Sequence, residues 1–141
     1  MDKTRRSRGE IAQEFLRGRN CAQCVLGTYA GDLGYEEEET DRMAACFGGG
    51  MELGQTCGAV TGALMAIGLA CEEKERAAAC AAAFRREFER RHGSCMCRDL
   101  LGCDLSKPDQ AAQARASGKL LDACPAFVES AVELLDDLLD D

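Results

Sequence analysis

The cysteines are the residues of this sequence with the most capacity for chemistry, because the chain has 10 of them in 141 residues. A cysteine reacts or binds a metal as its thiolate, and a helix N-terminus favours that form because its free N–H groups and dipole attract negative charge. Asn20 and Thr56 are expected N-cap residues that precede two cysteines, Pro125 follows a third, and a fourth directly precedes the expected short turn "RDLL". Four cysteines therefore stand at expected helix starts, where they would carry any sulphur chemistry: Cys21, Cys57, Cys97 and Cys124.

The other six cysteines divide into two groups by their surroundings. Three lie in or at the ends of apolar helical segments, where cysteine usually packs as a small buried side chain: Cys46, Cys71 and Cys80. The remaining three are candidates for additional or substitute ligands: Cys24, Cys95 and Cys103. The pairs "CAQC" and "CMC" also suit a structural zinc ion, which four thiolates bind in a tetrahedron.

The elements that position these cysteines are predicted to be helices, because apolar residues recur at helical spacing and strand signals are weak. The chain is long enough for one compact domain, 1–141. We predict an all-α, single-domain bundle of six to seven helices around a buried central helix at about 57–71. The other expected helices are one around 11–16 that ends near Gly18, one from Asn20, one over "EEEETDRMAACFG", then 73–92 with Gly93 as its C-cap, a short turn at 98–101, 108–122 and 125–139.

The central helix follows a glycine-rich stretch, "GGGMELGQTCGAVTG", at residues 48–62. This stretch is not expected to bind phosphate, because no Lys-Ser or Lys-Thr follows it and no strand precedes it. Within the helix, Gly58, Gly62 and Ala66 recur every four residues and form a small-residue ridge. We expect Gly58 to let the backbone approach a bound cofactor, and the ridge is a surface through which the chain would form a homodimer.

Charge and hydropathy exclude two classes of partner. The net charge of −8 argues against nucleic acid, since the phosphate backbone requires a basic surface. The longest apolar run, "CGAVTGALMAIGLAC", is too short to cross a bilayer of ~30 Å as a helix, and no apolar signal segment begins the chain. We therefore expect a cytoplasmic protein with reduced thiols, not embedded in a membrane. A docking face for a basic redox partner is expected at Asp136, Asp137, Asp140 and Asp141.

Four blocks of the sequence resemble the C_GCAxxG_C_C family of redox-active proteins: "NCAQCVL", "FGGGMELGQTCGAVTGALMAIGL", "CRDLLGCDL" and "CPAFV". The resemblance extends over about residues 10–130. The family pattern reads Gly-Cys-Ala at its centre, whereas this chain reads Cys57-Gly58-Ala59. The additional cysteines leave open whether Cys95 takes the place of Cys97. Carried onto this chain, the family cysteines are Cys21, Cys57, Cys97 and Cys124.

The resemblance implies a redox role for this chain. Because the family is similar to the iron–sulphur domain of split-Soret cytochromes, it also implies an iron–sulphur cluster, [2Fe–2S], on the four cysteines. Such a protein would transfer electrons or sense redox state. The alternative is thiol–disulfide exchange with Cys57 as the reactive thiol, because its helix is expected to be the most firmly held. Two further alternatives are a structural zinc site and a helical interaction module without a cofactor. The sequence also does not decide whether the chain is an enzyme.

Overall fold

A computed structural model of the chain describes residues 7–139, which form eight α-helices and one short turn, η2. In these residues there is no β-strand, and Thr56 and Met96 form an isolated antiparallel bridge. The all-α prediction is confirmed, although short segments raise the number of helices above the six to seven expected. In chain order the elements are α1 (Arg8–Leu16), α2 (Cys21–Ala30), α3 (Glu37–Met43), η2 (Gly50–Gly54), α4 (Gly58–Ala70), α5 (Lys74–His92), α6 (Cys97–Leu101), α7 (Pro108–Ala116) and α8 (Lys119–Leu139).

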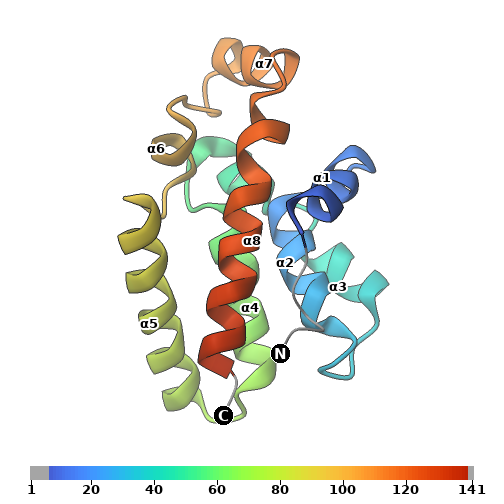
Figure 1. Cartoon of the computed structure of the whole chain (residues 1–141), viewed down its shortest axis with the longest axis vertical. Helices are drawn as coiled ribbons and strands as arrows, with labels where there is room; N and C mark the ends of the chain where they lie inside the picture. Colours follow the sequence, from blue (N-terminus) through green and yellow to red (C-terminus); the bar gives the residue numbers. More distant parts are fainter. Residues whose placement is uncertain (1–6, 140–141) are drawn as a thin grey trace.

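Helices α2, α4 and α8 form the centre of the bundle. Figure 1 shows α8 crossing in front of α4, with α5 on one side and α1, α2 and α3 on the other. The inner face of α4 is buried, as predicted for the central helix, and Phe84 and Phe88 of α5 pack into the same core. Across residues 7–139 no helix, α4 included, combines the length and apolar composition that a membrane span requires.

The small-residue ridge of α4 packs against α2 within the same chain. A Cβ atom on Gly62 would lie 2.7 Å from the carbonyl oxygen of Ala22, and one on Gly58 would lie 3.0 Å from the Cβ of Cys21. These two glycines therefore let the backbones of α2 and α4 approach closely. The ridge is already covered, so it is not available as the homodimer interface that the sequence suggested.

Two predicted helix ends are confirmed. Asn20 caps α2, because its side chain accepts a hydrogen bond from the Gln23 N–H while the Gln23 side chain accepts one from the Asn20 N–H. Gly93 ends α5 with a left-handed φ of 88°. Helix α4 begins one residue later than expected, with Cys57 instead of Thr56 at its N-cap.

The two C-terminal helices differ from the predicted 108–122 and 125–139. Helix α7 ends at Ala116, and the chain turns at Gly118, which has a φ of 77°. Helix α8 then runs without interruption from Lys119 to Leu139. The sequence predicted the break between the two helices directly before Pro125. In the structure the break lies several residues earlier, at Gly118.

Pro125 lies inside α8, in a position that usually disfavours a helix. It has no N–H to donate to the Leu121 carbonyl, and such a defect costs about 3 kcal/mol. Burial of the apolar stripe that follows, which includes Val128, Ala131 and Leu135, offsets this cost. As a result, Cys124 lies in the second turn of α8, and its predicted place at a helix start is wrong.

The glycine-rich stretch before α4 forms a left-handed turn. Four consecutive residues, Gly49, Gly50, Met51 and Glu52, have φ values between 59° and 63°. This conformation costs about 1–3 kcal/mol at a residue other than glycine, so the surrounding structure must hold Met51 and Glu52 in place. Only glycine fits at Gly50, since a Cβ there would lie 2.5 Å from the carbonyl oxygen of Gln55.

The acidic face at the C-terminus is only partly exposed. Asp136 is buried, and its carboxylate accepts a hydrogen bond of 2.7 Å from the Tyr29 hydroxyl. Asp137 is exposed, whereas Asp140 and Asp141 lie outside the described residues. Asp136 is therefore not available to a docking partner. Its hydrogen bond with Tyr29 instead helps to hold α8 against α2.

Candidate four-cysteine site

Four cysteines from four helices line one cavity of about 510 Å³. All four are buried, with at most 8% of each residue exposed. The other walls are largely apolar, with Phe15, Leu100 and Phe127 among the lining residues. The four residues, called the cavity cysteines below, are Cys21 in α2, Cys57 at the N-cap of α4, Cys97 in α6 and Cys124 in α8.

A short backbone pairing holds Cys57 and Cys97 beside each other. The Cys57 N–H donates to the Cys95 carbonyl at 2.8 Å, and the Cys97 N–H donates to the Gln55 carbonyl at 2.6 Å. These two bonds flank the bridge between Thr56 and Met96. The pairing therefore joins the start of α4 to the start of α6, although 40 residues separate the two cysteines.

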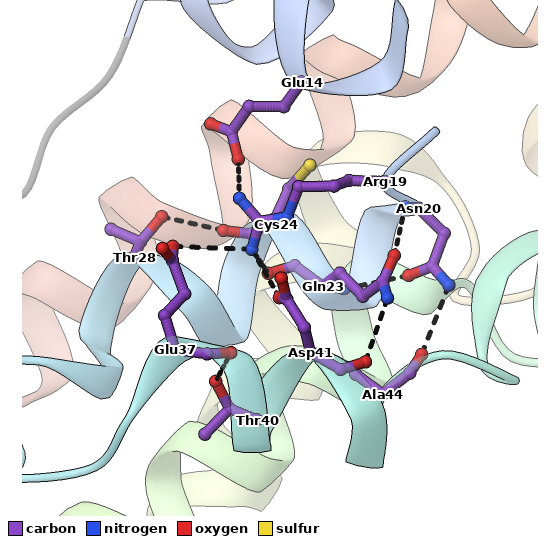
Figure 2. Close-up of polar contacts among 10 residues, drawn as sticks. All are labelled: Glu14, Arg19, Asn20, Gln23, Cys24, Thr28, Glu37, Thr40, Asp41 and Ala44. Atoms are coloured by element: carbon purple, nitrogen blue, oxygen red, sulfur yellow. Dashed lines mark hydrogen bonds and ion pairs between the residues drawn. The ribbon is translucent and has the colours of Figure 1, made fainter. Parts of the chain in front are cut away.

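A partly buried polar network positions the start of α2, which carries Cys21. Figure 2 shows the Arg19 guanidinium between the carboxylates of Glu14, Glu37 and Asp41. It donates to Asp41 at 2.6 Å and also to Glu14, whose side chain is only 8% exposed. These carboxylates belong to α1 and α3. The Arg19 side chain therefore connects both helices to residues 19–20, which directly precede Cys21.

Replacing Arg19 with methionine is expected to lower the free energy of unfolding by about 2 kcal/mol, because it removes the Arg19 cation from its ion pair with the buried Glu14 carboxylate. Urea unfolding of the reduced protein would measure this loss. The matched control is Arg90→Met, which removes an exposed ion pair with Glu87 and should have a much smaller effect. Equal effects of the two substitutions would contradict a stabilising role for the Arg19 network.

Burial keeps two of the cavity cysteines protonated at neutral pH. It raises the pKa of Cys57 to about 12, although the backbone N–H groups of Ala59 and Val60 act in the opposite direction. It also raises the pKa of Cys97 to about 12. The expected lowering of the Cys57 pKa at a helix start is therefore not seen, since the loss of water around the sulphur outweighs the two N–H groups.

The other two cavity cysteines form a hydrogen-bonded pair. The bond between the Cys21 and Cys124 side chains raises the pKa of Cys21 and lowers that of Cys124. Cys21 thus acts as the donor, and Cys124 is the cavity thiol that ionises most readily. Because the charge on Cys124 also raises the pKa values of Cys57 and Cys97, the four thiols titrate as an interacting group.

The raised pKa values predict that the metal-free, reduced protein loses stability as the pH rises from about 9 toward 12. In this range Cys57 and Cys97 stay protonated in the folded chain, whereas in the unfolded chain they ionise near 9.0. The unfolded state therefore binds fewer protons, and the free energy of unfolding falls by up to about 1.4 kcal/mol per pH unit for each thiol.

Urea unfolding of the reduced protein between pH 7 and pH 11 would measure this dependence. Cys57→Ala should show a shallower loss than the wild type, because one of the two thiols is gone. Cys46→Ala, which removes an exposed thiol, should keep the wild-type slope. A Cys57→Ala slope as steep as the wild-type slope would contradict the raised pKa.

The candidate substitute ligands do not line the cavity. The Cys95 thiol contacts the carbonyl of Arg85 on α5, at 3.7 Å. Cys24 is buried within α2, and Cys103 is half-buried just after α6. Of the two cysteines in "CMC", it is therefore Cys97 that lines the cavity.

The three cysteines expected to be buried have different surroundings. Cys46 is exposed, so that expectation is wrong for this residue: it lies in the turn after α3 and not within a helix. Cys71 is buried at the end of α4. Cys80 is half-buried on α5.

Sequence reasoning missed three charged residues that line the cavity: Arg19, Glu52 and Arg115. Arg19 had a usable signal, since it directly precedes the capping box that begins α2. Glu52 reaches the cavity only through the left-handed turn, and Arg115 only because α7 ends before Gly118. The residue types alone give neither of these backbone features.

Among residues 7–139, no group of three or more histidine, cysteine or acidic side chains is arranged to hold a metal ion directly. The cavity cysteines thus surround a shared space without converging on one ion-sized point. Gly58 lines the same space, and its missing side chain is also what allows α2 to pack against α4.

The fold and the site define an all-α bundle that gathers four buried thiols around one cavity. The chain belongs to the family described as "Putative redox-active protein (C_GCAxxG_C_C)", whose model matches residues 19–138. This match includes all four cavity cysteines and confirms the family that the sequence resembled. Comparisons with curated proteins and with solved structures gave no match.

Proposed function

We propose that this protein is an electron carrier or redox sensor whose cavity cysteines bind an iron–sulphur cluster, [2Fe–2S]. The observation that carries the proposal is that four buried thiols from four helices line one cavity. A [2Fe–2S] cluster takes four cysteine thiolates. The four cavity cysteines would supply these ligands.

The residues around the cavity suit such a centre. When bound, the cluster supplies one-electron transfer at a potential that depends on hydrogen bonds, charge and burial. The N–H groups of Ala59 and Val60, which favour the Cys57 thiolate, would donate to that sulphur and raise the reduction potential. Arg19 and Arg115 line the cavity and would offset part of the negative charge of the thiolates.

The same residues predict that loading releases protons. The ligands must be thiolates, yet burial keeps Cys57 and Cys97 protonated at neutral pH. Cys124, whose pKa is lowered by the Cys21 side chain, would supply a thiolate ligand most readily. The largely apolar walls would then keep water from the centre.

The experiment that tests the proposal is anaerobic purification from cells supplied with iron, followed by iron and acid-labile sulphide analysis and visible absorption. We expect a brown protein with about two irons and about two sulphides per chain. A colourless, iron-free protein from such cells would contradict the proposal.

A second candidate function, thiol–disulfide exchange, is favoured by the hydrogen bond between Cys21 and Cys124. Cys124, and not Cys57, would then attack a partner's disulfide, and Cys21 would resolve the mixed disulfide. Alkylation and peptide mapping after exposure to a small disulfide would detect the product. A Cys21–Cys124 disulfide would support this function, and fully alkylated cavity cysteines would contradict it.

A further inference from the structure

A second pair of thiols lies away from the cavity, where α4 meets α5. Cys71 follows the last residue of α4 and is buried, whereas Cys80 lies in the second turn of α5 and is half-buried. Figure 1 shows these two helices joined by a short turn at the lower end of the molecule. Neither cysteine lines the four-cysteine cavity.

The Cys71 side chain lies close enough to the Cys80 thiol to raise its pKa, so the two sulphurs are neighbours in the reduced protein. Both belong to one packed cluster of the core, with Cys71 buried in it and Cys80 packed against it. The surrounding side chains therefore hold the two thiols together across the turn between α4 and α5.

The surroundings also allow Cys80 to react. Its partial exposure gives a small molecule access, and Arg76, one helical turn earlier, favours the thiolate. Burial and the neighbouring Cys71 act against ionisation. Cys80 is thus expected to react more slowly than a free thiol. The mixed disulfide that forms on Cys80 then lies within reach of the Cys71 sulphur.

We propose that Cys71 and Cys80 form a second redox site, which low-molecular-weight disulfides oxidise to an intramolecular disulfide independently of the cavity. The Cys80 thiolate attacks one sulphur of the small disulfide, breaks its S–S bond and expels one small thiolate. The Cys71 thiolate then attacks the Cys80 sulphur of the mixed disulfide and expels the second. The two released thiolates take up the two protons that the cysteines lose, and the two electrons from the cysteines reduce the small disulfide to two thiols.

The new bond would cross-link a helical hairpin that is already closed at its other end. The bridge between Thr56 and Met96 joins the start of α4 to the segment after α5. Oxidation of the Cys71–Cys80 site would therefore fix both ends of the hairpin that connects Cys57 to Cys97. This inference goes beyond the proposed function, since it involves neither the cavity nor a cluster.

Peptide mapping of the full-length chain tests the proposal. The anaerobically reduced protein is incubated with oxidised glutathione, its free thiols are alkylated, and trypsin cleaves it. Cleavage after Lys74 and Arg76 separates peptide 43–74, which contains Cys71, from peptide 77–85, whose only cysteine is Cys80. We expect these two peptides joined by a disulfide in most molecules, which the reduced control lacks.

Three variants make the result specific. Cys71→Ser should abolish the link and leave glutathione on Cys80, whereas Cys46→Ser, which changes another cysteine of the same tryptic peptide, should retain it. Cys80→Ser should keep the iron content of the wild type, because the site is independent of the cavity. A link that persists in Cys71→Ser, or wild-type Cys80 recovered without any link, would overturn the proposal. Circular dichroism confirms folding, and Cys71→Ala replaces Cys71→Ser if the latter unfolds.

Discussion

Replacing Cys57 with alanine is expected to lower the iron bound per chain at least about tenfold and to remove the visible absorption of the anaerobically prepared protein. A [2Fe–2S] cluster needs four thiolates, and the loss of one leaves an iron without its full set of ligands. Even groups that only orient a ligand cost about 10–100-fold in metal affinity when removed, so loss of a ligand should cost at least as much. Alanine at Cys21, Cys97 or Cys124 should have the same effect.

The control for this prediction is a set of cysteines that do not line the cavity. Cys46→Ala removes an exposed thiol, and Cys95→Ala removes one that contacts the Arg85 carbonyl, so both should bind iron like the wild type. The comparison of Cys95→Ala with Cys97→Ala decides which cysteine of "CMC" is the ligand. Wild-type iron content in Cys97→Ala, together with loss in Cys95→Ala, would show that the cavity assignment is wrong.

Replacing Gly62 with alanine is expected to lower the free energy of unfolding by about 3 kcal/mol, toward the upper end of the range for overpacked cores. The added Cβ would lie 2.7 Å from the carbonyl oxygen and 3.0 Å from the Cα of Ala22. Both atoms belong to the backbone of α2, so the helix itself would have to move. Since α2 also carries Cys21, the same substitution should weaken iron binding.

Gly68→Ala is the matched control, because it makes the same change in the same helix. A Cβ on Gly68 would meet nothing within 4 Å, so only the helix propensity changes. Alanine should therefore stabilise the protein by up to about 1 kcal/mol. Urea unfolding of both variants measures the difference, and a stabilising effect of Gly62→Ala would contradict the close packing of α2 on α4.

The helices and their caps were largely predictable from the sequence, because they depend on local interactions. Asn20 and Gln23 form a capping box whose partners are three residues apart, and Gly93 ends α5 through its own left-handed backbone. The apolar spacing of α4 and α5 likewise depends on neighbouring residues. Such signals also brought Cys21 and Cys57 forward as candidates.

The features that the sequence did not predict depend on contacts between distant residues. Pro125 suggested a helix start, but burial of the stripe that includes Leu135 lets α8 continue through it. The pKa of Cys57 was expected to be low from its helix start, whereas the core that surrounds it raises the pKa to about 12. The hydrogen bond between Cys21 and Cys124 joins residues that are 103 positions apart, and no local pattern indicates it.

The central claim is that the cavity cysteines bind an iron–sulphur cluster, and native mass spectrometry of the anaerobically purified chain tests it most directly. The predicted result is a mass above that of the reduced chain by two irons and two sulphides, less the protons released by the ligating thiols, and this addition should be absent from Cys57→Ala. The mass of the reduced chain alone, of the chain with one zinc ion, or of a chain that has lost only the hydrogens of a disulfide would contradict the claim.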